Sequence, residues 1–154
     1  MRLPRGLWKL LKEILRHLLR RPVAGLMVLA RDPEGKILLV RRADSGSWAL
    51  PGGTVEWGET FRTTAVRELR EEAGAHVVSL GALRGAFSEP TRDPRFHAVT
   101  VVVEAQVAPQ LDGPDNPLEI REAVFFAEGE LPADFSHGTG DILRQILASP
   151  SVWE

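Results

Sequence analysis

The stretch that decides the fold runs from Gly52 to Ala75 and reads GGTVEWGETFRTTAVRELREEAGA. It opens with a glycine turn and continues into a segment that carries Glu68, Glu71 and Glu72 within five residues. On a helix each residue turns the chain by about 100°, so these three carboxylates share an arc of about 100°. The adjoining arc is apolar and holds Ala65, Val66, Leu69 and Ala73. We therefore predict a helix that packs by one side on a core and presents clustered negative charge on the next.

The clustered carboxylates indicate a metal site. Like charges three and four residues apart on a helix repel one another by roughly a few tenths of a kcal/mol per pair. A helix that needed only to be solvated would gain from mixed charges. Groups of carboxylate oxygens are what Mg²⁺ or Mn²⁺ prefers, with waters and substrate phosphates completing the shell. A solvated acidic face is the alternative interpretation, and the spacing of the whole stretch decides against it.

That spacing resembles the box of the Nudix (MutT-like) hydrolase family. Gly53 is followed after five residues by Glu59, and after seven more by the run RELREEAG at 67–74. Every fixed position of the family pattern is filled. The one departure is Ala75, where the family prefers a larger aliphatic residue, and it does not involve the acids. The box covers about a sixth of the chain.

The resemblance implies a fold, an activity and a cofactor. The fold is the Nudix α/β/α sandwich with a central mixed β-sheet. The activity is hydrolysis of a nucleoside diphosphate linked to another group X, with Mg²⁺ or Mn²⁺ as cofactor. A pyrophosphate repels hydroxide until cations neutralise it, and a divalent ion also lowers the pKa of a bound water.

The resemblance also assigns roles to residues, which we write as expectations. Glu68 and Glu72 match the metal ligands, and Glu71 is either a further ligand or shares the role of the base. The carbonyl of Gly52 matches the backbone ligand that precedes the box. Arg67 matches an arginine that orients the carboxylates, a task that suits a guanidinium group. The catalytic set is thus expected to be Glu68, Glu71, Glu72 and Arg67.

Three further glutamates are candidates for a role beside this catalytic set. Glu59 either anchors the loop before the helix or takes an additional metal. Glu119 and Glu122 are candidates for a general base delivered by a late loop. The alternative for both is a solvated charge at the end of a strand.

The loop at 87–97, FSEPTRDPRFH, bears on the substrate. Pro90 stands 16 residues after Gly74, and a proline about this far beyond the box resembles the mark of ADP-ribose pyrophosphatases. Arg92 and Arg95 are candidates to hold a phosphate or ribose, and Trp48 or Phe87 to stack on a base. Ordinary loop arginines and a core tryptophan are the alternatives. His97, at the start of an apolar strand, is interpreted as structural.

These features favour ADP-ribose as the substrate, cleaved to AMP and ribose 5-phosphate. The alternative is a (d)NTP or an oxidised nucleotide. The sequence contains no tyrosine, which speaks mildly against dinucleoside polyphosphates. A Nudix fold kept as a nucleotide-binding regulatory module is a second alternative, although such proteins usually lose box carboxylates and all are present here.

Composition indicates one globular domain. A chain of 154 residues is long enough to bury about 68–70% of its unfolded surface. The sequence has no cysteine, which excludes a disulfide framework, a thiol nucleophile and a cysteine zinc site, and fits a cytoplasmic location. No apolar run reaches the roughly 20 residues that a membrane span needs.

The first 21 residues differ from the rest in charge. They hold seven Arg or Lys and one Glu, net +6, whereas residues 22–154 carry net −8. The acidic remainder speaks against nucleic-acid binding. Apolar residues recur at helical spacing before Pro22, namely Leu7, Trp8, Leu10, Leu11, Ile14, Leu15, Leu18 and Leu19. We predict an N-terminal amphipathic helix within residues 1–21 and a Nudix domain at 22–154.

Three interpretations of this helix remain open. It packs on the acidic domain, pairs with a second subunit in a homodimer, or lies on an anionic membrane surface. Packing within the protein or dimer is favoured, since an apolar stripe most often covers a core.

Periodicity and turn residues predict the remaining elements. Strands are expected at 23–31, 37–40, 77–87, 97–107 and 120–127, with a tight turn at 32–35 and a glycine turn at 51–53. A short C-terminal helix is expected within 135–148.

Overall fold

The computed structural model describes residues 5–19, 21–136 and 138–154. The described helices are α1 (Arg5–Leu19), α2 (Phe61–Ala73) and α3 (Thr139–Ala148), with a short 3₁₀ helix η1 (Glu128–Glu130). The described strands are β1 (Val23–Arg31), β2 (Ile37–Arg42), β3 (Trp48–Ala49), β4 (Gly52–Thr54), β5 (Ala75–Phe87), β6 (Ala98–Leu111), β7 (Ile120–Phe126) and β8 (Val152–Trp153). No helix in the described ranges is long and apolar enough to cross a membrane.

The strands form one mixed sheet. Its order is β3-β2-β1-β6-β5-β8, with β4 also paired to β1 and β7 to β2. The pairs β1–β6 and β5–β8 are parallel, and the other pairs are antiparallel. The mixed sheet expected from the family resemblance is confirmed.

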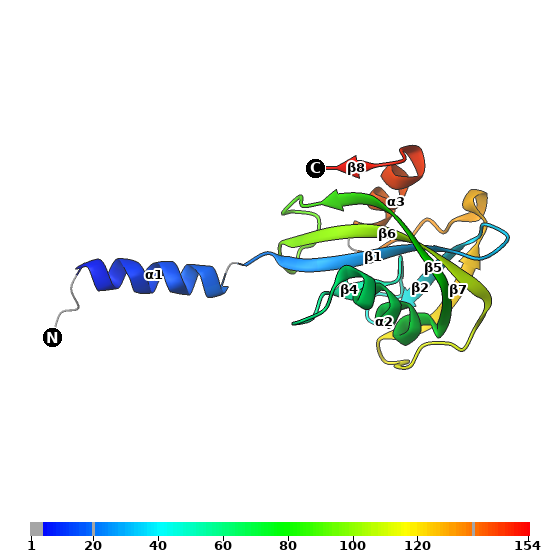
Figure 1. Cartoon of the computed structure of the whole chain (residues 1–154), viewed down its shortest axis with the longest axis horizontal. Coiled ribbons are helices and arrows are strands. Elements are labelled where there is room, and N and C mark those ends of the chain that lie inside the picture. The colour runs from blue at the N-terminus through cyan, green and yellow to red at the C-terminus, as the bar shows by residue number, and fades with distance from the viewer. Residues whose placement is uncertain (1–4, 20, 137) are drawn as a thin grey trace.

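Helices cover both faces of this sheet (Figure 1). Successive residues of β1 point to opposite faces, so Val28 joins the core beneath α2 while Leu29 joins the core beneath α3. The α2 side is filled by Ala65, Leu69 and Ala73 of that helix, and the α3 side by Ile142, Leu143 and Ile146. The α/β/α sandwich is therefore confirmed.

The predicted glycine turn is a strand in the structure. Gly52 and Gly53 belong to β4, where they pair with Met27 and Leu26 of β1. A Cβ atom on Gly52 would lie 2.1 Å from the carbonyl oxygen of Leu26. The prediction of a turn at 51–53 is therefore wrong for Gly52 and Gly53. Glycine is required at position 52 because β4 and β1 approach each other closely there.

Other boundaries differ modestly from the prediction. β6 runs on to Leu111, past the predicted end at residue 107, because its last residues pair with the start of β5. The strands β3 and β8 were not predicted. The tight turn before β2 is confirmed, with the amide of Gly35 donating to the carbonyl of Asp32.

The N-terminal helix is confirmed, but it does not cover the core. Side chains 6–15 of α1 are exposed, including the apolar residues Leu7, Trp8, Leu10, Leu11, Ile14 and Leu15. Figure 1 shows α1 extending away from the sheet. For these residues, the interpretation that the helix packs on the acidic domain of its own chain is wrong.

Candidate functional site

Both ends of α2 are fixed by local hydrogen bonds. At its start, Thr60 and Thr63 form a reciprocal capping box. At its end, Gly74 adopts a left-handed conformation (φ 61°) and donates its amide to carbonyls of the last turn. With the helix held in this register, Glu68 and Glu72 are buried against the sheet, whereas the side chain of Glu71 is 39% exposed.

Arg67 connects α2 to the loop before it. Its Nε and Nη2 donate to the two carboxylate oxygens of Glu59 at 2.8 and 2.9 Å. Its Nη1 donates to Glu68 at 2.8 Å and to Glu71 at 3.3 Å. Because α2 begins at Phe61, Glu59 lies outside the helix and anchors the loop through Arg67. The structure thus brings Arg67 together with two of the expected metal ligands.

Glu72 lies deepest in the site. Its Oε2 accepts a 2.8 Å hydrogen bond from the amide of Gly52. Burial raises the pKa of Glu72 to about 8, the Gly52 hydrogen bond opposes the rise, and the nearby carboxylates of Glu68 and Glu119 add to it. Burial also raises the pKa of Glu68, against the opposing effect of Arg67. Negative charge is therefore costly here unless a cation is added.

The buried carboxylates fit a divalent cation as their ligand partner, because its positive charge would offset the cost of burying their negative charge. Within the described ranges, no three His, Asp or Glu side chains already converge as metal ligands, and Glu68 and Glu71 instead contact Arg67. Yet the groove beside α2 is lined by a concentration of acidic residues, namely Glu56, Glu68, Glu71, Glu72, Asp115 and Glu119. A divalent cation with oxygen ligands would offset the charge that burial makes unfavourable.

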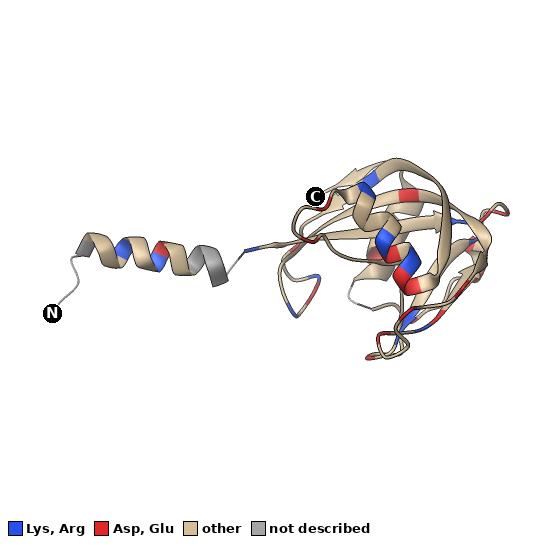
Figure 2. Cartoon of the chain, turned by 60° about the horizontal axis from the view of Figure 1, so that its bottom comes forward, with Lys and Arg blue, Asp and Glu red and all other residues tan. Residues whose placement is uncertain are grey.

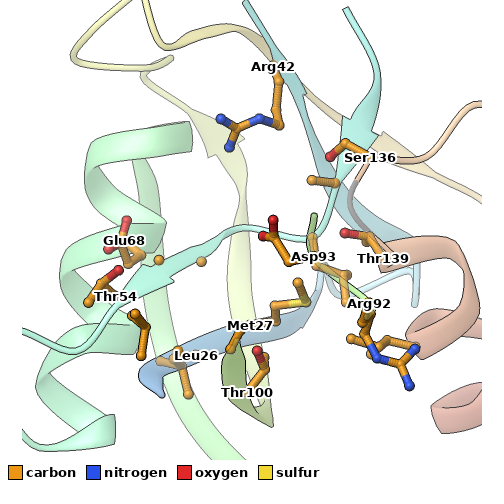
Figure 3. Close-up of a pocket in the computed structure, with 18 of the residues that line it drawn as sticks. Leu26, Met27, Arg42, Thr54, Glu68, Arg92, Asp93, Thr100, Ser136 and Thr139 are labelled. Carbon is orange, nitrogen blue, oxygen red and sulfur yellow. The ribbon is translucent and has the colours of Figure 1, made fainter. Parts of the chain in front are cut away.

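A cavity of about 360 Å³ extends from Glu68, Glu72 and Glu119 to the loop before β6. Glu68 and Glu72 line one end, and Arg92, Asp93 and Arg95 of the loop before β6 line the other. Figure 3 shows Glu68 across the cavity from Ser136 and Thr139, with Asp93 between them. The size matches a small-molecule pocket with a few polar groups.

The predicted substrate residues of the loop lie at this cavity, although two of them are engaged by other side chains. Phe87 is buried in the cavity wall, with the Arg92 guanidinium 5.5 Å above its ring. Arg92 also donates to Asp141 at 2.5 Å and contacts Glu154. The guanidinium of Arg95 pairs with Asp93 at 3.0 and 2.8 Å.

Two predicted residues lie outside both cavities. Trp48 packs edge-on against Phe126, with ring centroids 4.9 Å apart, as part of the core beneath α3. Glu122 lies on β7 and pairs with Arg41 at 3.2 Å. Glu119, by contrast, lines both the acidic groove and the 360 Å³ cavity.

Several lining residues were not identified from the sequence. Arg42 lies at the end of β2, held by two hydrogen bonds to Asp44, and its side chain is turned toward the cavity in Figure 3. Asp93 stands inside the quoted loop, between the predicted residues Arg92 and Arg95, but was not itself predicted. Ser136, which precedes α3, and Thr139, its first residue, are buried polar residues that line the cavity, and no local sequence signal marks them.

The predicted structural role of His97 agrees with its contacts. Its Nε2 lies 2.9 Å from the carbonyl oxygen of Ser88, which joins the two ends of the loop.

Comparisons with known proteins bear on this geometry. A family model described as the NUDIX domain matches residues 20–146. An ADP-ribose pyrophosphatase of Methanocaldococcus jannaschii is 39% identical over 105 residues, which are 66% of this chain and 60% of that protein. An RNA pyrophosphohydrolase of Halorhodospira halophila is 46% identical over 67 residues, 42% of this chain and 36% of that protein. The chain thus spans less than two thirds of the length of either relative.

Among solved structures, a MutT NUDIX hydrolase from Burkholderia pseudomallei superposes with a TM-score of 0.70. It is 27% identical, and the match covers 82% of this chain and 98% of that chain.

Proposed function

This chain belongs to the Nudix family, and we propose that it is a cytoplasmic, divalent-metal-dependent pyrophosphohydrolase that cleaves ADP-ribose to AMP and ribose 5-phosphate. One observation carries the proposal: a single cavity joins the buried carboxylates Glu68 and Glu72 to the arginine-containing loop with Arg92 and Arg95. The similarity to an ADP-ribose pyrophosphatase supports the same substrate.

In this proposal the box carboxylates hold the cation. Glu68, Glu72 and Glu71, with the carbonyl of Gly52, provide hard oxygen ligands for Mg²⁺ or Mn²⁺. The ion, when bound, neutralises the pyrophosphate and lowers the pKa of an attacking water. Arg67 keeps Glu68 and Glu71 in place through its hydrogen bonds.

We assign the general base to Glu119. It faces the same groove as Glu68 and Glu72, so it is placed to accept a proton from a water that attacks a phosphate held there. Glu122 is the weaker candidate, because it is paired with Arg41.

The two loop arginines have different roles: Arg95 contacts the substrate, and Arg92 positions the loop. The Arg95 side chain is 46% exposed and can reach a phosphate or ribose that enters the cavity. The Arg92 side chain is 14% exposed and held by Asp141 and Glu154, so it positions the loop and covers Phe87. Trp48 is assigned to the core.

A substrate panel tests this function. Product release is measured with Mg²⁺ and with Mn²⁺ on ADP-ribose, other nucleotide sugars, NADH, diadenosine polyphosphates, normal and oxidised (d)NTPs, and RNA with a 5′-triphosphate. The highest kcat/KM is expected for ADP-ribose, with AMP and ribose 5-phosphate as products. Preference for triphosphates would keep the metal site and discard Pro90 as a mark of specificity. Tight binding without turnover of any compound would indicate a regulatory module.

Replacement of one ligand tests the metal site separately from the substrate. Glu72→Gln removes a charge but keeps an acceptor for the Gly52 amide, so the fold should survive while kcat falls roughly 100-fold or more. The matched control is Glu128→Gln, an exposed glutamate paired with Arg31, whose kcat should stay within about twofold of wild type. Wild-type turnover by Glu72→Gln would refute the metal assignment.

A further inference from the structure

α1 separates apolar and charged side chains cleanly. Its described apolar residues, Leu7, Trp8, Leu10, Leu11, Ile14 and Leu15, are each about half exposed. At about 100° per residue they occupy an arc of about 160°. Lys9, Lys12 and Glu13 lie on the remaining part of the helix surface. Figure 2 shows basic and acidic positions along α1, which stands apart from the body of the molecule.

This apolar face has no cover from the rest of the described chain. All side chains from 6 to 15 are exposed, and α1 extends away from the sheet (Figure 1). A monomeric protein rarely leaves so continuous an apolar surface in water unless it contacts a partner.

We propose that α1 lies flat on an anionic lipid surface. Its apolar face would enter the boundary between head groups and acyl chains, and its basic residues would contact lipid phosphates. Charge complementarity supports this occupant, since residues 1–21 carry net +6. The cytoplasmic leaflet has the negative surface potential that attracts such a segment.

The width of the apolar arc favours lipid over a second copy of the helix. Two helices packed along a coiled-coil seam bury a narrow stripe, which would leave part of the 160° arc in water. A lipid surface covers all of it. The net charge of −8 on residues 22–154 opposes contact of the domain with the same anionic surface, so α1 alone would lie on the lipid.

The border of the arc also suits a membrane interface. Trp8 lies at one edge of the apolar arc, and Lys12 follows it at about 40° further round. Tryptophan is enriched at the level of the head groups. A lysine beside the apolar face can bury its stem in lipid while its ammonium group stays with the phosphates.

Sedimentation with vesicles tests the proposal on the full chain. One set of vesicles is phosphatidylcholine, and the other is phosphatidylcholine mixed with phosphatidylserine. We expect binding to the second set, weakening as salt is added. Leu11→Gln with Ile14→Gln should abolish binding while keeping helix propensity. Lys9→Gln with Lys12→Gln should weaken it about 30-fold.

Matched controls carry the same kinds of substitution, apolar to Gln and basic to Gln, within residues 22–154. Leu118→Gln alters an apolar residue that is 89% exposed, and Lys36→Gln with Arg144→Gln removes two exposed basic groups. Both controls should bind vesicles like wild type. Circular dichroism and thermal unfolding, unchanged in every variant, would show that the fold is intact.

Three results would overturn the proposal. The first is failure of the full chain to bind phosphatidylserine vesicles, and the second is equal binding by the α1 variants. The third is light scattering that shows a dimer without vesicle binding, converted to a monomer by Leu11→Gln with Ile14→Gln. That outcome would assign the apolar face to a second copy.

Discussion

At the scale of single residues, two adjacent glycines of β4 serve different purposes. A Cβ atom on Gly53 would lie 2.3 Å from Oε1 of Glu68, the tip of a flexible side chain. A Cβ atom on Gly52 would lie 2.1 Å from the backbone oxygen of Leu26. Gly53 therefore leaves space for a carboxylate of the site, whereas Gly52 allows β4 to approach β1.

The two alanine substitutions should separate activity from stability. Gly53→Ala should fold with nearly wild-type thermal stability but lose about tenfold or more in kcat/KM, because Glu68 must move from its place beside the cavity. Gly52→Ala should lower the free energy of unfolding by about 1–3 kcal/mol, because backbone must move. Denaturant unfolding and steady-state kinetics on both variants measure this. Equal destabilisation of the two would contradict it.

Glu59 gives a pH-dependent contribution to stability. Hydrogen bonds donated by the Arg67 side chain, then by the Glu56 amide and the Thr64 hydroxyl, lower its pKa to about 2. Because the pKa is lower in the folded than in the unfolded chain, the stabilisation is present above about pH 4.5 and is lost as the pH falls toward 2. Glu59→Gln should thus melt below wild type at neutral pH.

The gap in melting temperature between Glu59→Gln and wild type should narrow as the pH falls from about 4.5 toward 2. Thermal unfolding followed across this range measures it. A gap that is constant with pH would show that the carboxylate charge is not what Glu59 contributes. Glu34→Gln, a change at an exposed residue on another loop, is the control.

At the scale of elements, the sequence predicts α2 well because every signal for it is local. The predicted apolar arc and the terminal Gly74 lie within one segment. The structure confirms that Ala65, Leu69 and Ala73 are buried and that Gly74 ends the helix, whereas Val66, at the edge of the predicted arc, is 44% exposed. The short strands β3, β4 and β8 carry too few residues for a period of two to be visible. They exist because partners elsewhere in the chain pair with them.

The same distinction applies to the site. Glu68, Glu71 and Glu72 are neighbours on one helix, so the spacing of the box was enough to group them. Ser136 and Thr139 reach the cavity only through the packing of α3 on the sheet. The ion pair of Arg67 with Glu71 is a local i,i+4 pair on α2, whereas its pairing with Glu59 depends on how the loop before α2 folds back.

Arg84 joins the long strand β5 to α3. Its Nη1 donates to Glu104 at 2.7 Å, and its Nη2 contacts the carbonyls of Ile146 and Ser149 at the end of α3. Arg84→Met should lower the free energy of unfolding by about 2–4 kcal/mol, since carbonyls and a carboxylate lose a charged donor. Arg144→Met, at a 79% exposed side chain, should change it by less than about 0.5 kcal/mol. Urea unfolding of both variants decides this.

At the scale of the whole molecule, the two ends of the chain relate differently to the domain. None of the described side chains 6–15 of α1 is buried. At the other end, β8 pairs with β5, and Glu154 accepts hydrogen bonds from the amides of Ser88 and Glu89 at 3.1 Å each. Glu154 also contacts Arg92. The C-terminal segment therefore tethers the loop that forms one wall of the cavity.

Deletion at each end should reveal this difference. Removal of residues 1–21 takes away no described buried side chain, so the free energy of unfolding should change by less than about 1 kcal/mol and KM should stay the same. Removal of residues 150–154 should destabilise the chain and raise KM, because the loop at 88–97 loses its tether. Denaturant unfolding and substrate titration on both deletions measure these effects. If removal of residues 1–21 lowers the free energy of unfolding by several kcal/mol, α1 packs on the domain in solution. If removal of residues 150–154 leaves KM unchanged, the loop at 88–97 is held by its other contacts, and Glu154 does not position it.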